Sequence, residues 1–181
     1  MAAIHTNSQV AQVLEMPQGL EPWYALYVRP KTEKVVQDLL RGKGYEVFLP
    51  TYLSLRRWSD RTVELQAPLF PSYVFTRLDI ENRLPVLKTP GVMHVVGLGR
   101  VPLPLPEAEI EAVRKMVDSS TGVKPYPFLR KGQKVQIRTG PLAGAEGVLV
   151  RAKTGYRLVV SIDMLQRSVA AEVDLVDVRP V

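Results

Sequence analysis

The sequence predicts an α+β protein with two domains: an N-terminal antiparallel sheet with packed helices, then a linker and a small C-terminal all-β barrel. Two segments with helical periodicity alternate with strand-like runs up to residue 117, and such periodicity is absent from residue 129 onward. Between them, SSTGVKPYPF is rich in Ser, Gly and Pro, which is typical of a linker. We expect a mobile tail at 1–20, domains at 21–117 and 129–181, and a linker at 118–128.

The N-terminal domain begins with a strand and a helix. WYALYVRP carries apolar residues on both faces, as a central strand covered on both sides does. In the next segment, KTEKVVQDLLRGKG, Thr32 is a candidate N-cap and Gly42 or Gly44 a stop. One apolar stripe is expected on this helix, formed by Val35, Val36, Leu39 and Leu40.

The rest of this domain is expected to be mostly β. YEVFLPTYLSLRRW and RTVELQAPLF are two strands of a hairpin with a basic tip around SDR. SYVFTRL is a further strand that begins after Pro71, and GVMHVVGLGR is another. LPEAEIEAVRKMVDSS predicts a second helix, because proline and acids stand at its start. Its buried stripe is expected from Ile110, Val113 and Val117.

Composition excludes several classes of function. The 181 residues include no cysteine, so disulfides, zinc–thiolate centres and thiol catalysis are excluded. No apolar run approaches the ~20 residues that span a bilayer, and the N-terminus lacks the pattern of a signal peptide. We expect a cytoplasmic protein without membrane contact, although a cysteine-free secreted protein would have the same composition. The net charge of +6 favours an acidic partner such as nucleic acid.

The sequence contains no recognisable catalytic site and implies no cofactor and no metal. His5 lies in the expected tail, and a lone histidine such as His94 is more often packed than catalytic. The glycines near Gly140 do not form a phosphate-binding loop, because no Gly-Lys-Ser/Thr follows them. We therefore expect a binding protein and not an enzyme.

Two sets of motifs resemble the NusG family. GQKVQIRTGPLAGAEGVLV resembles a KOW motif, with glycines suited to tight turns. Upstream, WYALYVRPKTEKVVQDLL, VFLPTY, RRWSDR, PLFPSYVF and GVMHVVGLG stand in the order of an NGN domain. The resemblance covers nearly the whole chain after the tail. PLFPSYVF and RRWSDR look most like the specialised paralogues of the RfaH and UpxY type, which resemble antiterminators of long operons.

The resemblance implies a transcription elongation and antitermination factor that binds RNA polymerase. In the family, aromatic residues on the first strand and around PLFPSYVF line a depression that receives the clamp helices of the polymerase β′ subunit. Carried over by position, the polymerase-binding residues are Tyr27, Phe70, Tyr73 and Phe75, with Leu98 at the edge. From the residues alone, all these aromatics could equally be core. A contact with the polymerase β subunit stays open, because segment 82–87 lacks the family's motif for it.

Two further contact surfaces follow from the resemblance. Specialised paralogues place a basic surface beside upstream DNA and the non-template strand. The matching residues are Arg29, Arg41, Lys43, Arg56, Arg57 and Arg61, which also suit a solvated face. The family's KOW domain binds Rho or a small-subunit ribosomal protein, at positions near Met164, Leu165 and Arg167. The sequence there departs from the usual aromatic-Gly-Arg pattern, which speaks against Rho.

Three functional hypotheses stay open. The leading one is a monomeric specialised factor that suppresses pausing or termination on a specific long operon. Within the family, the alternative is a housekeeping NusG that acts with Rho and the ribosome. Outside this role, the alternative is a KOW-type ribosome- or RNA-binding protein, which has no need of an apolar groove on its first domain.

Overall fold

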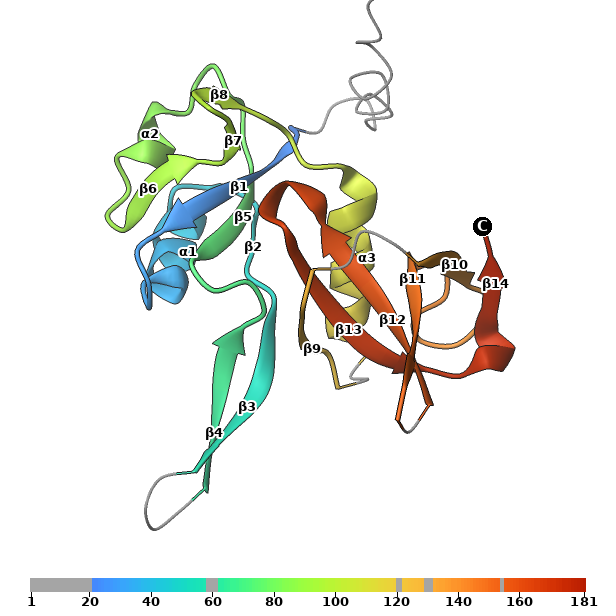
Figure 1. Ribbon diagram of the computed structural model, residues 1–181. Helices are drawn as coiled ribbons and strands as arrows, with labels where there is room; N and C mark the ends of the chain where they lie inside the picture. The colour runs from blue at the N-terminus through green and yellow to red at the C-terminus, as the bar shows by residue number, and fades with distance from the viewer. Residues whose placement is uncertain (1–20, 58–61, 120–121, 129–131, 154) are drawn as a thin grey trace, which may run out of the picture.

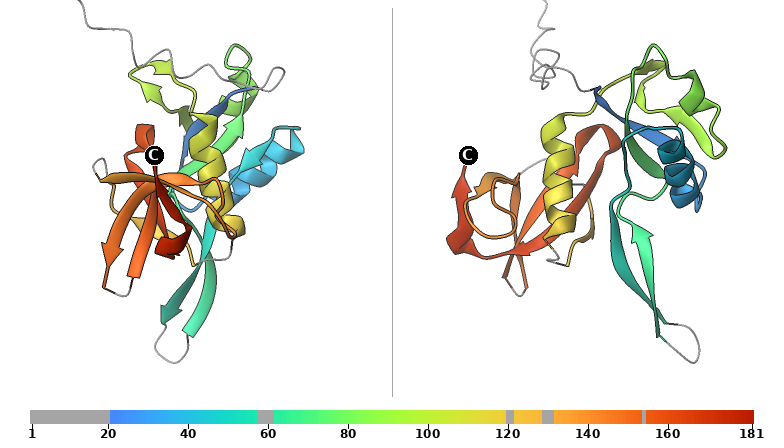
Figure 2. Two further views of the ribbon diagram at one scale, coloured as in Figure 1. Left: turned by 90° about the vertical axis from the view of Figure 1, so that its right-hand side faces the viewer. Right: turned by 180° about the vertical axis from the view of Figure 1, so that it is seen from behind.

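The computed structural model describes residues 21–57, 62–119, 122–128, 132–153 and 155–181. The expected tail at 1–20 lies outside the described residues. Two β-rich bodies stand on either side of helix α3 (Glu107–Asp118), as Figures 1 and 2 show. In the part of the chain that is described, no helix is long and apolar enough to cross a membrane.

The first body is a four-stranded antiparallel sheet in the order β2-β5-β1-β6. Its strands are β1 (Trp23–Val28), β2 (Val47–Phe48), β5 (Tyr73–Arg77) and β6 (Val92–Val95). Because side chains alternate along a strand, β1 contributes side chains to two separate cores. Trp23 and Ala25 enter one, while Tyr24 and Leu26 enter the other. The expectation of a central strand covered on both sides is confirmed.

Helix α1 (Glu33–Gly42) covers one face of this sheet. Val36 and Leu40 are fully buried against it, in a cluster that we call the α1 core. The expected four-residue stripe is wrong, because Val35 and Leu39 are 56% and 39% exposed. Each precedes a buried residue by one position, which on a helix is a turn of about 100° away from the sheet.

Strands β3 (Thr51–Arg57) and β4 (Thr62–Pro68) form the expected hairpin, but the single strand expected over YEVFLPTYLSLRRW is divided, because its start forms β2 of the sheet. The hairpin projects from the first body and pairs with no strand of the four-stranded sheet among the described residues (Figure 1). Its expected tip, residues 58–61, lies outside the described residues. Exposed leucines line its strands at Leu53, Leu55 and Leu65.

In the described part of the first body, the sequence did not predict the short elements α2 (Leu84–Leu87), β7 (Gly97–Leu98) and β8 (Val101–Pro102). Consequently, the single strand expected over GVMHVVGLGR is divided into β6 and β7. Gly97 accounts for the sharp return of the chain, because a Cβ placed there would lie 2.0 Å from the carbonyl oxygen of Val101. Only glycine permits this close approach between two backbones.

The second body is a six-stranded antiparallel sheet in the order β14-β10-β11-β12-β13-β9. Its strands are β9 (Lys124–Tyr126), β10 (Gln133–Ile137), β11 (Glu146–Ala152), β12 (Gly155–Ile162), β13 (Arg167–Val173) and β14 (Val178–Pro180). Two 3₁₀ turns complete it, η2 (Asp163–Leu165) and η3 (Leu175–Asp177). β9 falls inside the segment 118–128 that we expected as a linker, where it pairs with β13.

The two bodies share one hydrophobic core with α3 between them (Figure 2). The expected α3 stripe is confirmed, since Ile110 and Val113 are buried and Val117 packs against the same core. This shared core extends from the sheet, through α3, into the barrel, and includes Trp23, Phe75, Ile110, Met116, Val160, Ile162 and Val169. The second face of the N-terminal sheet is therefore closed by a helix and a barrel that come much later in the chain.

Candidate functional site

Three neighbouring strands bring three aromatic rings together at one edge of the shared core. Tyr27 on β1 lies directly opposite Tyr73 on β5, and their ring centroids are 5.5 Å apart in an edge-to-face arrangement. On the other side of β1, His94 of β6 lies opposite Tyr27 with a centroid distance of 5.2 Å. Both tyrosines are partly exposed and His94 is exposed. We call these three residues the tyrosine patch.

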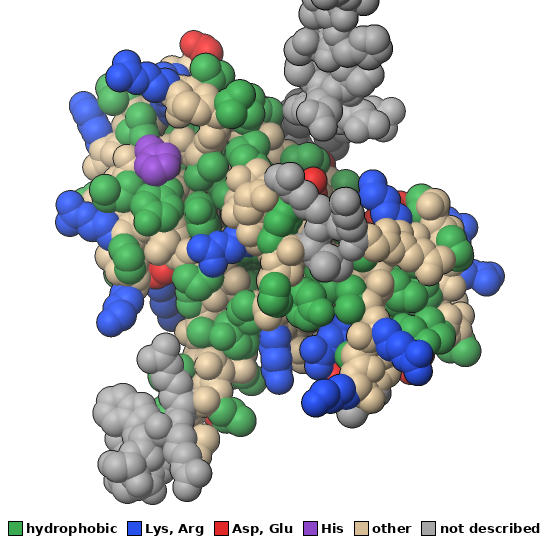
Figure 3. All heavy atoms as spheres, in the orientation of Figure 1, with side chains coloured by type: hydrophobic (Ala, Val, Ile, Leu, Met, Phe, Trp, Pro, Cys, Tyr) green, Lys and Arg blue, Asp and Glu red, His purple; other side chains and the backbone are tan. Residues whose placement is uncertain are grey.

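The patch lies on the surface of the first body. Figure 3 shows a histidine side chain at the surface among hydrophobic side chains, and His94 is the histidine within the described residues. Its exposed position corrects the expectation that His94 would be packed. The sequence carried no signal for its proximity to Tyr27, because that proximity depends on the pairing of β1 with β6.

Phe70 and Phe75 do not share this exposure. They are 1% and 0% exposed, and their rings meet edge to face at 5.5 Å inside the shared core. Phe75 also lies 6.2 Å from the ring of Phe48. The expected four-residue aromatic surface is thus divided in this structure. Two of its members are core because α3 and the barrel cover that part of the sheet, and the two tyrosines stand at its border.

The barrel reaches the tyrosine patch through the segment that was expected to bind a second partner. The guanidinium carbon of Arg167 lies 6.0 Å from the centre of the Tyr73 ring, within the range of a cation–π contact. Leu165 is buried in the shared core, and Met164 packs against it. The candidate partner-binding residues of the barrel therefore lie against the shared core and the tyrosine patch.

A buried carboxyl group lies where α3 meets this same segment. The Oε2 atom of Glu109 is shielded from solvent and has no hydrogen-bond partner among the described residues. Burial, and to a lesser extent the nearby Asp163 carboxylate, raise the pKa of Glu109 to about 7, against the opposing effect of a hydrogen bond with the Asp163 backbone. The protonated form of Glu109 is therefore favoured by the contact between α3 and η2.

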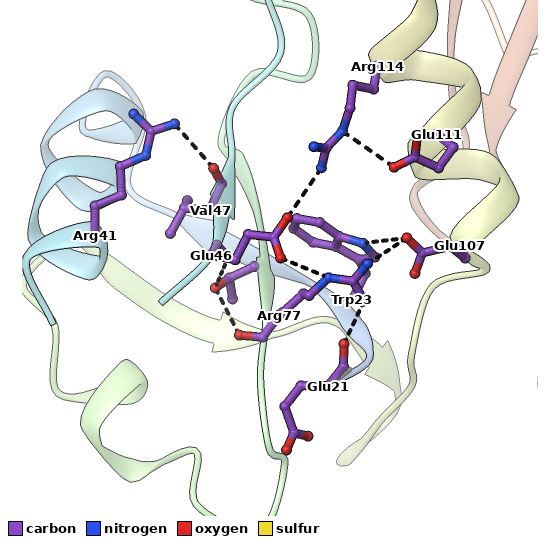
Figure 4. Close-up of polar contacts among 10 residues, drawn as sticks. Glu21, Trp23, Arg41, Glu46, Val47, Arg77, Glu107, Glu111 and Arg114 are labelled. Atoms are coloured by element: carbon purple, nitrogen blue, oxygen red, sulfur yellow. Dashed lines mark hydrogen bonds and ion pairs between the residues drawn. The ribbon is translucent and has the colours of Figure 1, made fainter. Parts of the chain in front are cut away.

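A polar network also joins α3 to the N-terminal sheet (Figure 4). The Arg77 guanidinium lies 2.6 Å from Glu107 and 3.0 Å from Glu46, and it covers the Trp23 ring at 4.7 Å. The Trp23 indole donates a hydrogen bond to Glu107 at 3.2 Å, and Arg114 of α3 lies 3.6 Å from Glu46. These contacts join β1, β5 and α3 into one unit.

The candidate DNA-binding residues differ in whether their charged groups have hydrogen-bond partners in the described part of the chain. Arg29 is exposed, and only its backbone is hydrogen-bonded, to Gly91 and Thr32; within the described part of the chain its guanidinium makes no hydrogen bond or ion pair. Arg41 donates to the Val47 carbonyl at 3.3 Å. The Lys43 ammonium donates to the Pro85 carbonyl at 2.8 Å and to the Thr89 hydroxyl at 2.7 Å, so it is engaged in holding α2.

Other expected site residues lie apart from this group. The backbones of Arg56 and Arg57 belong to β3, but their side chains and all of Arg61 lie outside the described residues. Leu98 is 77% exposed on β7, which pairs with β8 in a small ribbon of its own. The structure therefore groups Tyr27 with Tyr73, and places Leu98 on a separate element.

A family model described as "Transcription termination factor nusG" matches residues 21–114. The transcription termination/antitermination protein NusG of Helicobacter pylori strain J99 is 24% identical over 165 residues, which cover 83% of this chain and 93% of that protein. The Thermus thermophilus protein of the same name is 27% identical over 176 residues, which cover 84% and 94%. A solved structure described as a domain interaction in Thermotoga maritima NusG has 21% identity and a TM-score of 0.49, covering 88% of this chain and 97% of that chain.

Proposed function

The chain belongs to the NusG family of transcription factors, whose family model matches more than half of it, and from this premise we propose that it binds RNA polymerase as an elongation and antitermination factor. The proposed contact surface is the tyrosine patch, and its proposed partner is the pair of clamp helices of the polymerase β′ subunit. The observation that carries the proposal is the pairing of Tyr27 with Tyr73 in adjacent strands, with both rings partly exposed.

The physical basis of this contact is a preorganised pair of aromatic anchors. A tyrosine ring offers a large apolar area and a polar tip, which makes it a frequent hot spot of protein interfaces. Here the rings of Tyr27 and Tyr73 are held by the β1–β5 ladder and by each other. Little conformational entropy is then lost on binding, so more of the buried area contributes to affinity.

We propose that the barrel limits access to this surface until polymerase is met. Arg167 lies over Tyr73, and the core that contains Phe70 and Phe75 continues into α3 and the barrel. When the barrel moves aside, the two phenylalanines join the tyrosines in one larger docking surface. The free energy needed for that movement is subtracted from the affinity of the full chain for polymerase.

Binding would act without covalent chemistry. A factor that binds one conformation of the polymerase more tightly than another shifts the enzyme toward that conformation. We propose that the clamp-closed, elongating state is the favoured one, which would suppress pausing or termination. Displacement of the barrel would also free Met164 and Arg167 for a second partner, either a small-subunit ribosomal protein or Rho.

Nucleic acid is the second proposed contact of the first domain. Arg29 is the best supported of the candidate residues, because its charge is not engaged within the described part of the chain. Arg41 and Lys43 both have local partners, so a DNA phosphate would compete with those bonds. Phosphate contacts of this kind give affinity that decreases as salt rises and carry little sequence information.

We further propose a specialised role on a long operon, on the basis of the PLFPSYVF and RRWSDR segments. A housekeeping role is equally compatible with the family assignment, and genome context separates the two. A specialised factor heads a long biosynthetic operon, whereas a general factor stands among translation genes. An RNA-binding role through the basic barrel is the remaining alternative, and it does not use the tyrosine patch.

The direct test is a binding titration of purified core RNA polymerase with the full chain and with the Tyr27→Ala/Tyr73→Ala variant. We expect the double variant to bind at least about tenfold more weakly, as loss of two aromatic anchors does. Tyr156→Ala is the matched control, since it removes a partly buried tyrosine from β12. If the double variant folds and binds as tightly as wild type, polymerase docking at this patch is refuted.

A further inference from the structure

The turn that leads into β5 has an unusual backbone. Ser72 adopts a φ of 67°, in the left-handed region that residues with a Cβ rarely occupy. It immediately precedes Tyr73, whose amide donates to the Phe70 carbonyl at 3.1 Å across the same turn. The direction in which Tyr73 enters the sheet therefore depends on the conformation of Ser72.

Both polar groups of the Ser72 backbone are held from outside the turn. Its carbonyl accepts a hydrogen bond from the Val28 amide of β1 at 2.9 Å. Its amide donates to Oε1 of Glu33 at 2.8 Å. Two elements distant in sequence thus fix this one residue, and the second of them does so through a side chain.

The position of Glu33 in this contact requires burial of its carboxylate. It begins α1, and it is only 7% exposed, which is rare for a glutamate. Burial of a carboxylate is unfavourable unless the group is hydrogen-bonded. The Ser72 amide supplies such a bond, and the N-terminus of α1 favours a negative charge. Removal of the carboxylate would leave the Ser72 amide without its acceptor.

We propose that Glu33 is a positioning residue for the tyrosine patch. Its carboxylate holds the Ser72 peptide in the left-handed conformation, so that Tyr73 meets Tyr27 at the geometry seen here. Without it, Ser72 returns to negative φ, the start of β5 rotates, and the two rings separate. The consequence for polymerase binding rests on the function proposed above, whereas the geometric role does not.

The test compares four full-length variants: Glu33→Ala, Glu33→Gln, Ser72→Gly, and Glu33→Ala combined with Ser72→Gly. Glutamine retains an oxygen acceptor at the same place, and glycine adopts a φ near 67° without the penalty that serine has. The first readout is the nuclear Overhauser effect between the Tyr27 and Tyr73 rings in the absence of polymerase. The second is the affinity for purified core polymerase, and Asp38→Ala on the exposed side of α1 is the control.

We expect Glu33→Ala to lose the ring-to-ring signal and to bind polymerase about tenfold more weakly, as loss of a hydrogen bond to a charged group implies. Glu33→Gln and Ser72→Gly should retain both properties. The combined variant should regain both, because glycine restores the turn without the carboxylate. A residue needed only for general stability would not be rescued in this way.

Several results would overturn the inference. Glu33→Ala could keep the ring-to-ring signal, or the combined variant could fail to regain it. If Glu33→Ala does not fold, restored folding in the combined variant supports the positioning role, and continued misfolding contradicts it. If the ring-to-ring signals follow expectation but every variant binds polymerase equally, the positioning role stands and the proposed polymerase contact fails.

Discussion

The two faces of the N-terminal sheet are closed in different ways. On one face, α1 follows β1 directly in the chain and buries Val36 and Leu40 completely. On the other face, α3 and a separate barrel do the same for Phe70 and Phe75. The first cover follows β1 directly in the chain, whereas the second includes the barrel, whose displacement from the first domain is part of the function proposed above. Equal burial in the two cores therefore has different consequences for function.

The largest effect is expected on the α1 face. Leu40→Ala removes a fully buried side chain and should lower the free energy of unfolding by about 2 to 5 kcal/mol. Chemical denaturation measures this loss. Polymerase affinity of the molecules that remain folded should not increase, because no docking surface is released. Tighter binding by Leu40→Ala would contradict the difference between the two faces.

The α3–barrel contact should depend on pH through Glu109. Its pKa is raised from 4.5 to about 7 in this contact, so the contact is strongest below pH 4.5 and is weakened as pH rises through 7. The expected loss between pH 4.5 and pH 7 is on the order of 3 kcal/mol. The NMR chemical shifts of residues at the α3–barrel contact, followed against pH, would measure this loss.

Glu109→Gln should abolish most of this pH dependence, because glutamine has no proton to lose. Glu111→Gln is the matched control, since Glu111 lies on the same helix and pairs with Arg114 at 3.4 Å. If the pH profile is unchanged in Glu109→Gln, Glu109 is not the group that makes the α3–barrel contact depend on pH.

The smallest effect is expected from the cation–π contact of Arg167 with Tyr73. Arg167→Ala should lower the free energy of the contact between the barrel and the tyrosine patch by about 0.5 to 1 kcal/mol. This corresponds to a gain in polymerase affinity of about two- to fivefold. Arg151→Ala, at an exposed position of β11, should leave the affinity unchanged. Weaker polymerase binding by Arg167→Ala would mean that Arg167 contacts polymerase itself.

Much of the fold could be predicted because strong local patterns coincide with real elements. The two-sided apolar run of β1, the hairpin around SDR and the acidic start of α3 were all recognisable from the sequence. Local pattern could not decide which apolar residues of α1 face the sheet, since Val35 and Leu39 have the same spacing as Val36 and Leu40. The position of the sheet relative to the helix decides that.

Tertiary pairing explains what the sequence did not reveal. The segment of β9 contains Pro125 and resembles a linker, yet β13 offers it a free edge. The sequence predicted the aromatics as one surface, whereas in the structure they are divided into core and border, and that division depends on where the barrel lies. Glu33 gave no signal of its own, because its role depends on a turn far along the chain.

The most direct measurement is hydrogen exchange of the full chain with and without core RNA polymerase. We expect the amides of β5 to become more protected, since polymerase covers the tyrosine patch. The amides of η2 and the start of β13 should become less protected, because the barrel leaves the first domain. Increased protection centred on α1, or unchanged protection at η2, would contradict the account. The first result would place the polymerase contact on another face, and the second would mean that the barrel stays in place.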